Sequence, residues 1–304
     1  MSIVPMPILL DRARRGGYAV GYFESWDLAS LEAVIDAAEA ERSSVIVGFG
    51  GMMVDGAWLE ARGVRMLGGA ARAAAELASV PTAVMFNEAQ TVAQAEAALT
   101  AGYNCLLLST DSLPAAEALR VTADLTARAH AAGLAVEAEL GHLPDWTSGR
   151  ETGGELTDPV EAAAFVAATN IDCLAVSIGN VHVKADGWAA IDSQRLESLY
   201  DAVGIPFAIH GGTSFPPSAI PHAVEHGVAK MNVGTILKRV YLDALRASVG
   251  SLPPDLDVHE ALGSRKPRDI TSAARAALTA KVRELMRAYG SSGKAAGCTE
   301  GGVS

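Results

Sequence analysis

Apolar runs of strand length alternate with longer segments of helical period along most of the chain. The longer segments repeat apolar residues at three- and four-residue spacing, as Leu28–Glu41 does. Most of the short runs are continuously apolar, which is typical of parallel strands covered on both faces. Eight strands are predicted in this way: Tyr18–Phe23, Ser44–Phe49, Thr82–Phe86, Cys105–Leu108, Ala135–Glu139, Cys173–Ser177, Phe207–Ile209 and Lys230–Val233.

Eight strand–helix units predict an α/β fold, namely a closed (β/α)8 TIM barrel that forms a single domain over residues 1–304. An open doubly wound sheet is the alternative. Asp158-Pro159-Val160-Glu161 has the order of an N-cap, a proline at the first helical position and a returning carboxylate, so it predicts a helix start. Another helix is expected over Thr91–Thr100. The C-terminal helix Ile270–Tyr289 should pack outside the barrel, before a flexible tail at 290–304.

The composition narrows the kind of protein. Of the 304 residues, 50% are hydrophobic and only 5% aromatic, which predicts one substantial core packed with small aliphatic side chains. The net charge of -11, without a basic block, argues against nucleic-acid binding. No apolar run reaches the length of a membrane span, about 20 residues, and the N-terminus lacks signal-peptide order. The expected compartment is therefore the cytoplasm.

The cysteines do not point to a disulfide framework or a zinc knuckle. There are three, Cys105, Cys173 and Cys298, an odd number without paired short spacing. Cys105 and Cys173 begin predicted strands, where a free thiol behaves as a small buried hydrophobe. We therefore expect these two to be buried.

Polar residues gather where the predicted strands end. In a (β/α)8 barrel the C-terminal ends of all strands meet at one face, which carries the chemistry. A single polar strand end could be coincidence, but here most strands end in this way. The residues are Glu24, Asn87, Glu88, Ser109, Asp111, Glu137, Glu139, His182, His210 and Asn232.

Two of these histidines are candidate metal ligands. His182 follows the sixth strand and His210 ends the seventh, so both should face the barrel mouth together with Glu88 and Glu139. Imidazole and carboxylate together suit Zn2+, Mn2+, Fe2+ or Co2+. A satisfied polar residue is the alternative for either histidine alone. The remaining histidines are expected at the surface: His130, His142, His222, His226 and His259.

Two glycine-containing loops follow the seventh and eighth strands. The first is Gly211-Gly212-Thr213 and the second is Asn232-Val233-Gly234-Thr235. Glycines let backbone N–H groups approach an anion and hydroxyls add donors, and these two loops commonly bind phosphate in such barrels. Tight βα turns are the alternative. We expect an anion or substrate site here.

The order of these motifs carries a family resemblance. The chain resembles the class II, metal-dependent fructose-bisphosphate (ketose-bisphosphate) aldolases over nearly its full length. The matching segments are Gly17–Gly21, Val136–Gly141, Thr157–Pro159, Leu174–Gly179 with His182, His210–Thr213, and Lys230–Val233 with Thr235.

The resemblance implies a homodimer or homotetramer acting on a small-molecule substrate. It also implies a divalent metal that polarises a ketose carbonyl during aldol cleavage. Zn2+ is the expected ion, with Mn2+, Co2+ or Fe2+ as alternatives. An acid/base residue moves the proton of the C4 hydroxyl.

The chain departs from the family at the third strand. Where the family has His-Leu-Asp-His, this sequence has Met85-Phe86-Asn87-Glu88. Glu88 thus replaces a metal-binding histidine, and with His182 and His210 it would complete a His2Glu site. Asn87 replaces the acid/base aspartate, and an amide can only orient or hydrogen-bond.

Other departures lie around the expected substrate. Glu24 stands where the family has Asn, and Gly234 where it has Asp. Asp145 lies in a segment that replaces the acidic stretch of the family's mobile loop.

Three functions stay open at this point. Glu24 or Asp145 takes over proton transfer in an aldolase-type lyase, which is the favoured interpretation. The alternatives are a metal-dependent isomerase or epimerase, and a barrel without catalysis used for binding or assembly. Because the changed positions would touch the substrate, we expect fructose 1,6-bisphosphate to be poor. Another hydroxy-keto sugar, sugar phosphate or acid should be preferred.

Overall fold

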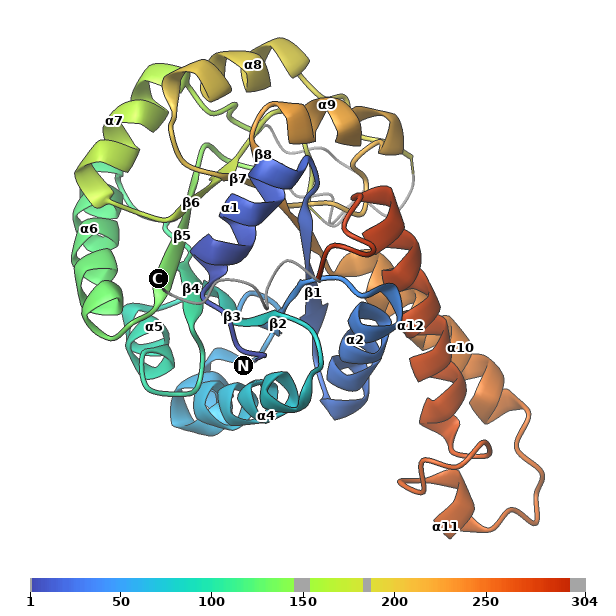
Figure 1. Ribbon diagram of the computed structural model, residues 1–304. Coiled ribbons are helices and arrows are strands. Elements are labelled where there is room, and N and C mark those ends of the chain that lie inside the picture. Colours follow the sequence, from blue (N-terminus) through green and yellow to red (C-terminus); the bar gives the residue numbers. More distant parts are fainter. Residues whose placement is uncertain (1, 145–153, 183–186, 296–304) are drawn as a thin grey trace, which may run out of the picture.

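The computed structural model describes residues 2–144, 154–182 and 187–295 (Figure 1). Eight parallel strands follow one another in chain order and close into a barrel, so the predicted (β/α)8 architecture is confirmed and the open sheet is excluded. The strands are β1 (Val20–Ser25), β2 (Val45–Gly50), β3 (Thr82–Ala89), β4 (Cys105–Leu108), β5 (Ala135–Leu140), β6 (Cys173–Val176), β7 (Phe207–Ile209) and β8 (Val228–Val233).

Helices connect and surround the strands. Those of the first half are α1 (Met6–Gly16), α2 (Leu28–Glu41), α3 (Gly56–Trp58), the π-helix η1 (Leu59–Gly63), α4 (Val64–Leu77), α5 (Val92–Ala98) and α6 (Ala115–Ala131). Those of the second half are α7 (Pro159–Thr169), α8 (Ser193–Ala202), the 3-10 helix η2 (Pro217–Ala219), α9 (Ile220–Glu225), α10 (Thr235–Gly250), α11 (Val258–Ala261) and α12 (Ile270–Ala288).

Most predicted elements lie within two residues of the observed ones, and one difference affects the site. Strand β3 does not stop at Phe86 but continues through Asn87 and Glu88 to Ala89. Its pairing with β4 shifts register between Phe86 and Ala89. A bulge of this kind redirects side chains at a strand end. Asn87 and Glu88 are therefore part of the barrel wall.

The barrel interior is filled by small side chains together with a few larger ones, Tyr22 among them. Alternate strand residues face inward, and Ala83, Cys105 and Cys173 belong to this inner cluster. An eight-stranded barrel has room only for side chains inside it. Leu9 and Leu10 of α1 pack on the same cluster and close the N-terminal end of the barrel, a helix that the sequence pattern did not predict. Both described cysteines are free and buried, as expected.

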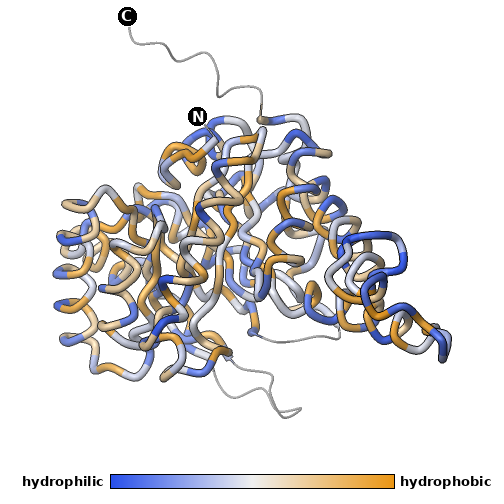
Figure 2. Tube along the Cα trace, turned by 90° about the horizontal axis from the view of Figure 1, so that it is seen from below, coloured by the Kyte–Doolittle hydropathy of each residue, from blue (hydrophilic) through white to orange (hydrophobic). Residues whose placement is uncertain are grey.

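A helical arm extends from the barrel. In Figure 1, α10 and α12 run side by side away from the strands, with α11 at the far end of the arm. Helix α12 also lies along α2, where Glu41 contacts Arg283 and Arg287. Figure 2 shows hydrophilic stretches at the projecting end.

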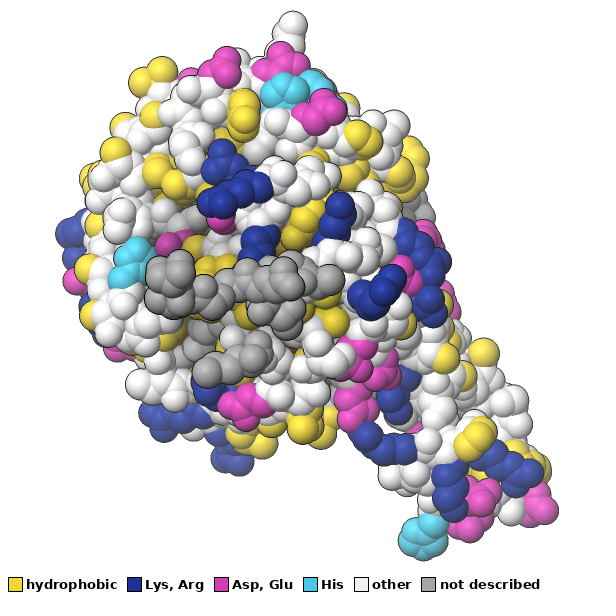
Figure 3. All heavy atoms as spheres, in the orientation of Figure 1, with side chains coloured by type: hydrophobic (Ala, Val, Ile, Leu, Met, Phe, Trp, Pro, Cys, Tyr) yellow, Lys and Arg dark blue, Asp and Glu magenta, His cyan; other side chains and the backbone are white. Residues whose placement is uncertain are grey.

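The visible surface carries both signs of charge. Figure 3 shows Lys and Arg side chains interspersed with Asp and Glu on the face toward the viewer. Among the described residues, none of the helices combines the length and apolar character needed to cross a bilayer.

Candidate active site

Three predicted metal ligands meet at the C-terminal mouth of the barrel. Glu88 comes from β3, His182 from the segment after β6 and His210 from the end of β7. Each offers a ligand atom, and these atoms all lie within 4.8 Å of one another. Nδ1 of His210 is 3.2 Å from Oε1 of Glu88. The structure thus brings together residues of three different strand ends, far apart in the chain, in a set that suits a divalent cation.

Glu139 touches the same histidine from β5. Its Oε2 is 3.3 Å from Nδ1 of His210. Burial raises the pKa of Glu139 to about 8, although the charge of His210 works in the opposite direction. Glu139 contacts His210 but is not one of the three residues whose ligand atoms are mutually close.

The other nitrogen of His210 is fixed from inside the barrel. Nε2 lies 2.9 Å from Oε1 of Glu137, and Nζ of Lys230 lies 2.8 Å from the other oxygen of the same carboxylate. Burial favours protonation of Glu137, but the charge of Lys230 and the hydrogen bond with His210 outweigh it and hold its pKa at about 2. Glu137 is therefore ionised and accepts the Nε2 proton, which leaves Nδ1 facing Glu88 and Glu139.

The carboxylates around His210 favour its protonated form. Burial lowers its pKa, but the hydrogen bonds with Glu137 and Glu88 and the charge of Glu139 raise it more, to about 10. Nδ1 of His210 faces the carboxylates of Glu88 and Glu139, and a divalent cation would lie among these donors. The residues present fit such a cation, because nitrogen and carboxylate donors already converge on one positive charge.

Glu88 has an unusual backbone conformation. Its φ is +53°, in the left-handed region that side chains other than glycine rarely adopt. The backbone of Gly51 passes close by, since a Cβ added there would be 2.6 Å from the carbonyl oxygen of Glu88. Burial favours protonation of Glu88, yet the hydrogen bond with His210 and the charges of His210, His182 and Lys230 keep its pKa below the usual value. Strain of this kind concentrates at functional sites.

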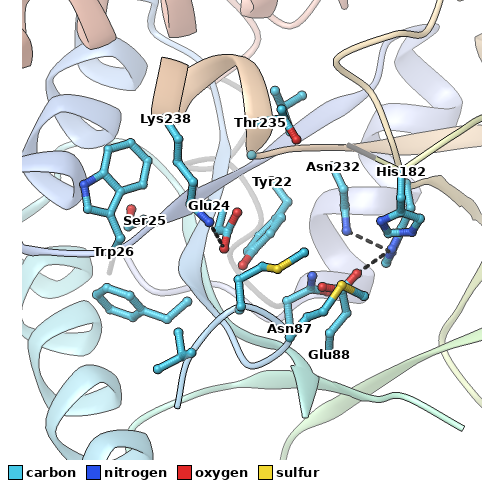
Figure 4. Close-up of a pocket in the computed structure, with 18 of the residues that line it drawn as sticks. Tyr22, Glu24, Ser25, Trp26, Asn87, Glu88, His182, Asn232, Thr235 and Lys238 are labelled. Carbon is cyan, nitrogen blue, oxygen red and sulfur yellow. Dashed lines mark hydrogen bonds and ion pairs between the residues drawn. The ribbon is translucent and has the colours of Figure 1, made fainter. Parts of the chain in front are cut away.

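A cavity of about 550 Å3 opens onto the cluster. Figure 4 shows Glu24 inside it, joined to Lys238 and lying between Trp26 on one side and the histidines on the other. Oε1 of Glu24 is 2.9 Å from Nζ of Lys238, in the first turn of α10. Burial raises the pKa of Glu24, while Lys238 partly offsets the shift. Sequence analysis missed Lys238, because no pattern links it to Glu24.

Three buried oxygens of the cavity lining lack protein partners. They are the hydroxyl of Tyr22, Oγ of Ser25 and Oδ1 of Asn87, which form no hydrogen bond with the described part of the chain. An unsatisfied buried polar group costs about 1–3 kcal/mol. Tyr22 was also missed from the sequence, because it falls inside an apolar strand.

The two glycine loops differ in what they offer an anion. The N–H of Gly212 is already donated to the carbonyl of Asn232, at 3.0 Å, so this part of the predicted anion site is committed to the barrel. Oγ1 of Thr213 accepts the N–H of Ile236 at 3.2 Å. Gly211, Thr213, Gly234 and Thr235 line the cavity, and α10 starts at Thr235. The N-terminus of a helix attracts anions.

Asp145 and a pair of histidines outside the barrel mouth were also considered in the sequence. Asp145, the alternative acid/base residue, lies outside the described residues. Glu197 of α8, His222 of α9 and His226, the residue after α9, form a second group with mutually close ligand atoms, although both histidines had been expected to be ordinary surface residues. The four-residue spacing of the histidines was a usable signal, whereas nothing in the sequence connects Glu197 to them.

The fold and the site together define a class: a (β/α)8 barrel with two histidines and a carboxylate at its C-terminal mouth that could hold a metal ion. A family model for class II fructose-bisphosphate aldolase matches residues 4–294. The chain is 34% identical to a fructose-bisphosphate aldolase of Geobacillus stearothermophilus, with 97% of this chain and all of that one aligned (100%). The chain belongs to the class II fructose-bisphosphate aldolase family.

Other relatives agree with this membership. A 6-phospho-5-dehydro-2-deoxy-D-gluconate aldolase of Bacillus subtilis is 29% identical, over 97% of this chain and 98% of that one. The crystal structure of the YdjI aldolase from Escherichia coli K12 superposes with a TM-score of 0.78 at 26% identity, covering 96% and 99% of the two chains. The resemblance inferred from the motifs is thus confirmed. The chain is an aldolase-type carbon–carbon lyase of a metal-dependent family.

Proposed function

We propose that this protein cleaves a hydroxy-keto sugar phosphate, or a related acid, other than fructose 1,6-bisphosphate, and that Glu24 moves the proton. The observation that carries this proposal is a partly buried carboxylate, paired with Lys238, whose pKa is raised in the cavity next to Glu88 and His210. Raised carboxylate pKa values are typical of acid/base groups that work near neutral pH. Asn87 lines the same cavity, but its amide cannot take over this role.

Glu88, His182 and His210 would hold the cation, with Glu139 beside them. A bound divalent metal supplies a Lewis acid for the carbonyl oxygen of the ketose, and Zn2+ is the proposed ion for this donor set. Glu137 keeps His210 oriented, and Asn87 can hydrogen-bond the substrate. Asn232 supports His210 instead, because its Nδ2 lies 2.9 Å from Nε2 of His210 and its Oδ1 accepts from Nζ of Lys230 at 2.6 Å. Asp145 remains a proposed second acid/base residue.

The proposed anion site joins the loops after β7 and β8. Gly211, Thr213, Gly234 and Thr235 line this part of the cavity, at the positive end of α10. Gly212 supports the site sterically, since a Cβ there would be 2.7 Å from the carbonyl of Asn232. A phosphate or carboxylate on the ketone fragment is the proposed ligand.

The substrate is proposed to differ from fructose 1,6-bisphosphate because Glu24 occupies the cavity. Oε2 of Glu24 would be 2.2 Å from a Cβ at position 234, so Gly234 leaves the room that this carboxylate uses. The aldolase of Bacillus subtilis that is named for a phosphorylated deoxygluconate substrate supports a broader substrate range in the family.

The test is a substrate panel with metal-loaded protein. Zn2+, Mn2+, Co2+ and Fe2+ are each added to chelator-treated protein, and cleavage of ketose phosphates and keto-acid phosphates is followed by aldehyde release. Glu24→Gln should reduce turnover by about 10²–10⁴-fold with metal content unchanged. Glu88→Gln and His182→Ala should instead lower the metal content. Efficient cleavage of fructose 1,6-bisphosphate, or full activity of Glu24→Gln, contradicts the proposal.

Assembly and compartment are also proposed. The helical arm exposes Leu242, Val249, Val258 and Leu262, which suits a homodimer or homotetramer, and sedimentation equilibrium tests this. The free buried cysteines suit the reducing cytoplasm, which localisation of the tagged protein checks. We also propose that residues 1–304 form one catalytic domain.

A further inference from the structure

Beyond Glu24, the cavity ends in a surface that the proposed mechanism does not use. This surface is built by the residue after β1, by the end of β2 and by the segment before α4. We call it the apolar wall; it consists of Trp26, Phe49, Met52, Met53, Val54 and Trp58. Figure 4 shows Trp26 on the side of Glu24 opposite to the histidines. The cavity therefore has a metal-binding end and an apolar end.

One part of the apolar wall is rigid and another is adaptable. Phe49 is buried in the outer core, and the ring of Trp26 meets Tyr241 of α10 edge-on at 5.2 Å. Met53 is 58% exposed at the rim. Methionine side chains adjust to apolar groups of different shape. The apolar wall can thus accept apolar substituents of different shape, with the Met53 side chain adjusting and the packed rings of Phe49 and Trp26 staying in place.

The charges near the apolar wall disfavour an anion. Lys238 is the only lysine or arginine among the described residues of the lining, and it is paired with Glu24. A phosphate placed there would lose its hydration without gaining an unpaired cation, which is unfavourable. An alkyl or aryl group instead gains about 25 cal/mol for each Å2 of apolar surface removed from water.

We propose that the aldehyde fragment of the substrate carries an alkyl or aryl group, and no phosphate, that lies on the apolar wall. This inference rests on the proposed function. In aldol cleavage the base takes the hydroxyl proton, the carbon–carbon bond breaks, and its electron pair stays with the ketone fragment, which is then protonated. The carbonyl group of the released aldehyde carries no charge. Because Glu24 lies between the metal cluster and Trp26, the substituent of the aldehyde extends toward the apolar wall.

The first experiment follows condensation by the metal-loaded protein. Dihydroxyacetone phosphate and dihydroxyacetone serve as donors, with propanal, butanal, pentanal, phenylacetaldehyde and glyceraldehyde 3-phosphate as acceptors. For each methylene from propanal to pentanal, kcat/KM should rise about fourfold. Every apolar acceptor from butanal on should exceed glyceraldehyde 3-phosphate. A flat series, or preference for the phosphorylated aldehyde, overturns the inference while the aldolase function stands.

The second experiment needs no turnover. Inert 2-phenylethanol and glycerol 3-phosphate are titrated against tryptophan fluorescence. We expect saturable binding of 2-phenylethanol only. If 2-phenylethanol binds but no donor reacts with any acceptor, the proposed function fails and the apolar site stands. If 2-phenylethanol does not bind, the inference is wrong.

A charge introduced at the rim provides the control. Met53→Arg should weaken 2-phenylethanol binding about tenfold, because the apolar surface is lost and a charge would be desolvated, and should create binding of glycerol 3-phosphate. Met66→Arg is the matched variant, since Met66 is a similarly exposed methionine of α4 outside the cavity lining. Unchanged binding of both probes by the Met53→Arg protein overturns the inference. A second copy of the chain covering the apolar wall would instead make 2-phenylethanol binding depend on protein concentration, which also overturns it.

Discussion

Oε1 of Glu137 lies 2.9 Å from Nε2 of His210, across the imidazole ring from Glu88. Glu137 and Lys230 are both fully buried beneath the site and paired with each other. Glu137 therefore decides which nitrogen of His210 faces the cation position, although it does not reach that position itself. A carboxylate behind a metal-binding histidine fixes the tautomer and makes the imidazole a better donor.

Glu137→Gln should weaken metal binding about 10–100-fold, because the amide orients His210 less strongly than a carboxylate. Competition with a fluorescent zinc chelator measures this affinity. The variant also leaves Lys230 buried without its counterion, so Glu137→Gln with Lys230→Met is the control that restores stability. Wild-type metal affinity in both variants would show that Glu137 has no orienting role.

Lys238→Met should shift the pH dependence of kcat/KM. Burial raises the pKa of Glu24 and Lys238 lowers it, so loss of the cation raises that pKa further. A general base works only when deprotonated, and the acid limb of the profile therefore moves to higher pH. Arg246→Met, at an exposed position of the same helix, should leave the profile unchanged. An unmoved acid limb in the Lys238→Met enzyme would exclude Glu24 as the base.

Gly51→Ala should lower metal affinity while the protein stays folded. The added Cβ would meet the carbonyl oxygen of Glu88 at 2.6 Å and must displace the bulge that presents this ligand. Gly69→Ala in α4 is the matched control, because nothing lies within 4 Å of the added Cβ. It should stabilise the helix by about 0.5–1 kcal/mol. Equal metal affinity in the two variants would contradict this role of Gly51.

Glu41→Gln should destabilise the protein by about 1–2 kcal/mol near pH 7, because Glu41 accepts charged hydrogen bonds from Arg283 and Arg287 that join α2 to α12. The hydrogen bonds from Arg287, Arg283 and Ser292 lower the pKa of Glu41 to about 2. With a depressed folded-state pKa, its contribution is complete above the unfolded pKa of about 4.3 and is lost as the pH falls toward 2.

Urea unfolding at several pH values tests this prediction. The free energies of unfolding of wild type and Glu41→Gln should converge in acid, since a protonated Glu41 resembles glutamine. A constant difference down to pH 2 would be inconsistent with the ion pair as its source. Glu284→Gln, at an exposed position of α12, should have little effect at any pH.

Most of the barrel could be predicted because its signals are local. Each strand is a short apolar run, the apolar spacing of Leu28–Glu41 predicts a helix, and the N-cap sequence at Asp158 marks a helix start; the structure reproduces both. Helix α1 was not predicted. It precedes the first strand, and its sequence does not indicate that its apolar face packs against the end of the barrel. That Leu9 and Leu10 close the barrel is a property of the assembled core.

The candidate site was partly predictable for a different reason. Chain order places every strand end at one mouth, so Glu88, His182 and His210 could be expected together from the sequence alone. The partners of these residues could not be foreseen. Lys238 reaches Glu24 from a helix 214 positions away, and Tyr22 lies in an apolar strand. Such contacts depend on side-chain direction across the barrel.

The sequence by itself determined the closed barrel, the aldolase family and the residues at the mouth, because strand periodicity and motif order are properties of neighbouring positions. Only the tertiary structure decided which nitrogen of His210 faces Glu88, that the N–H of Gly212 is already used, and that an apolar wall lies beyond Glu24. These features arise where segments distant in the chain pack against one another and remove polar side chains from water. Burial and charge then act over a few ångströms of space, whatever the separation along the chain.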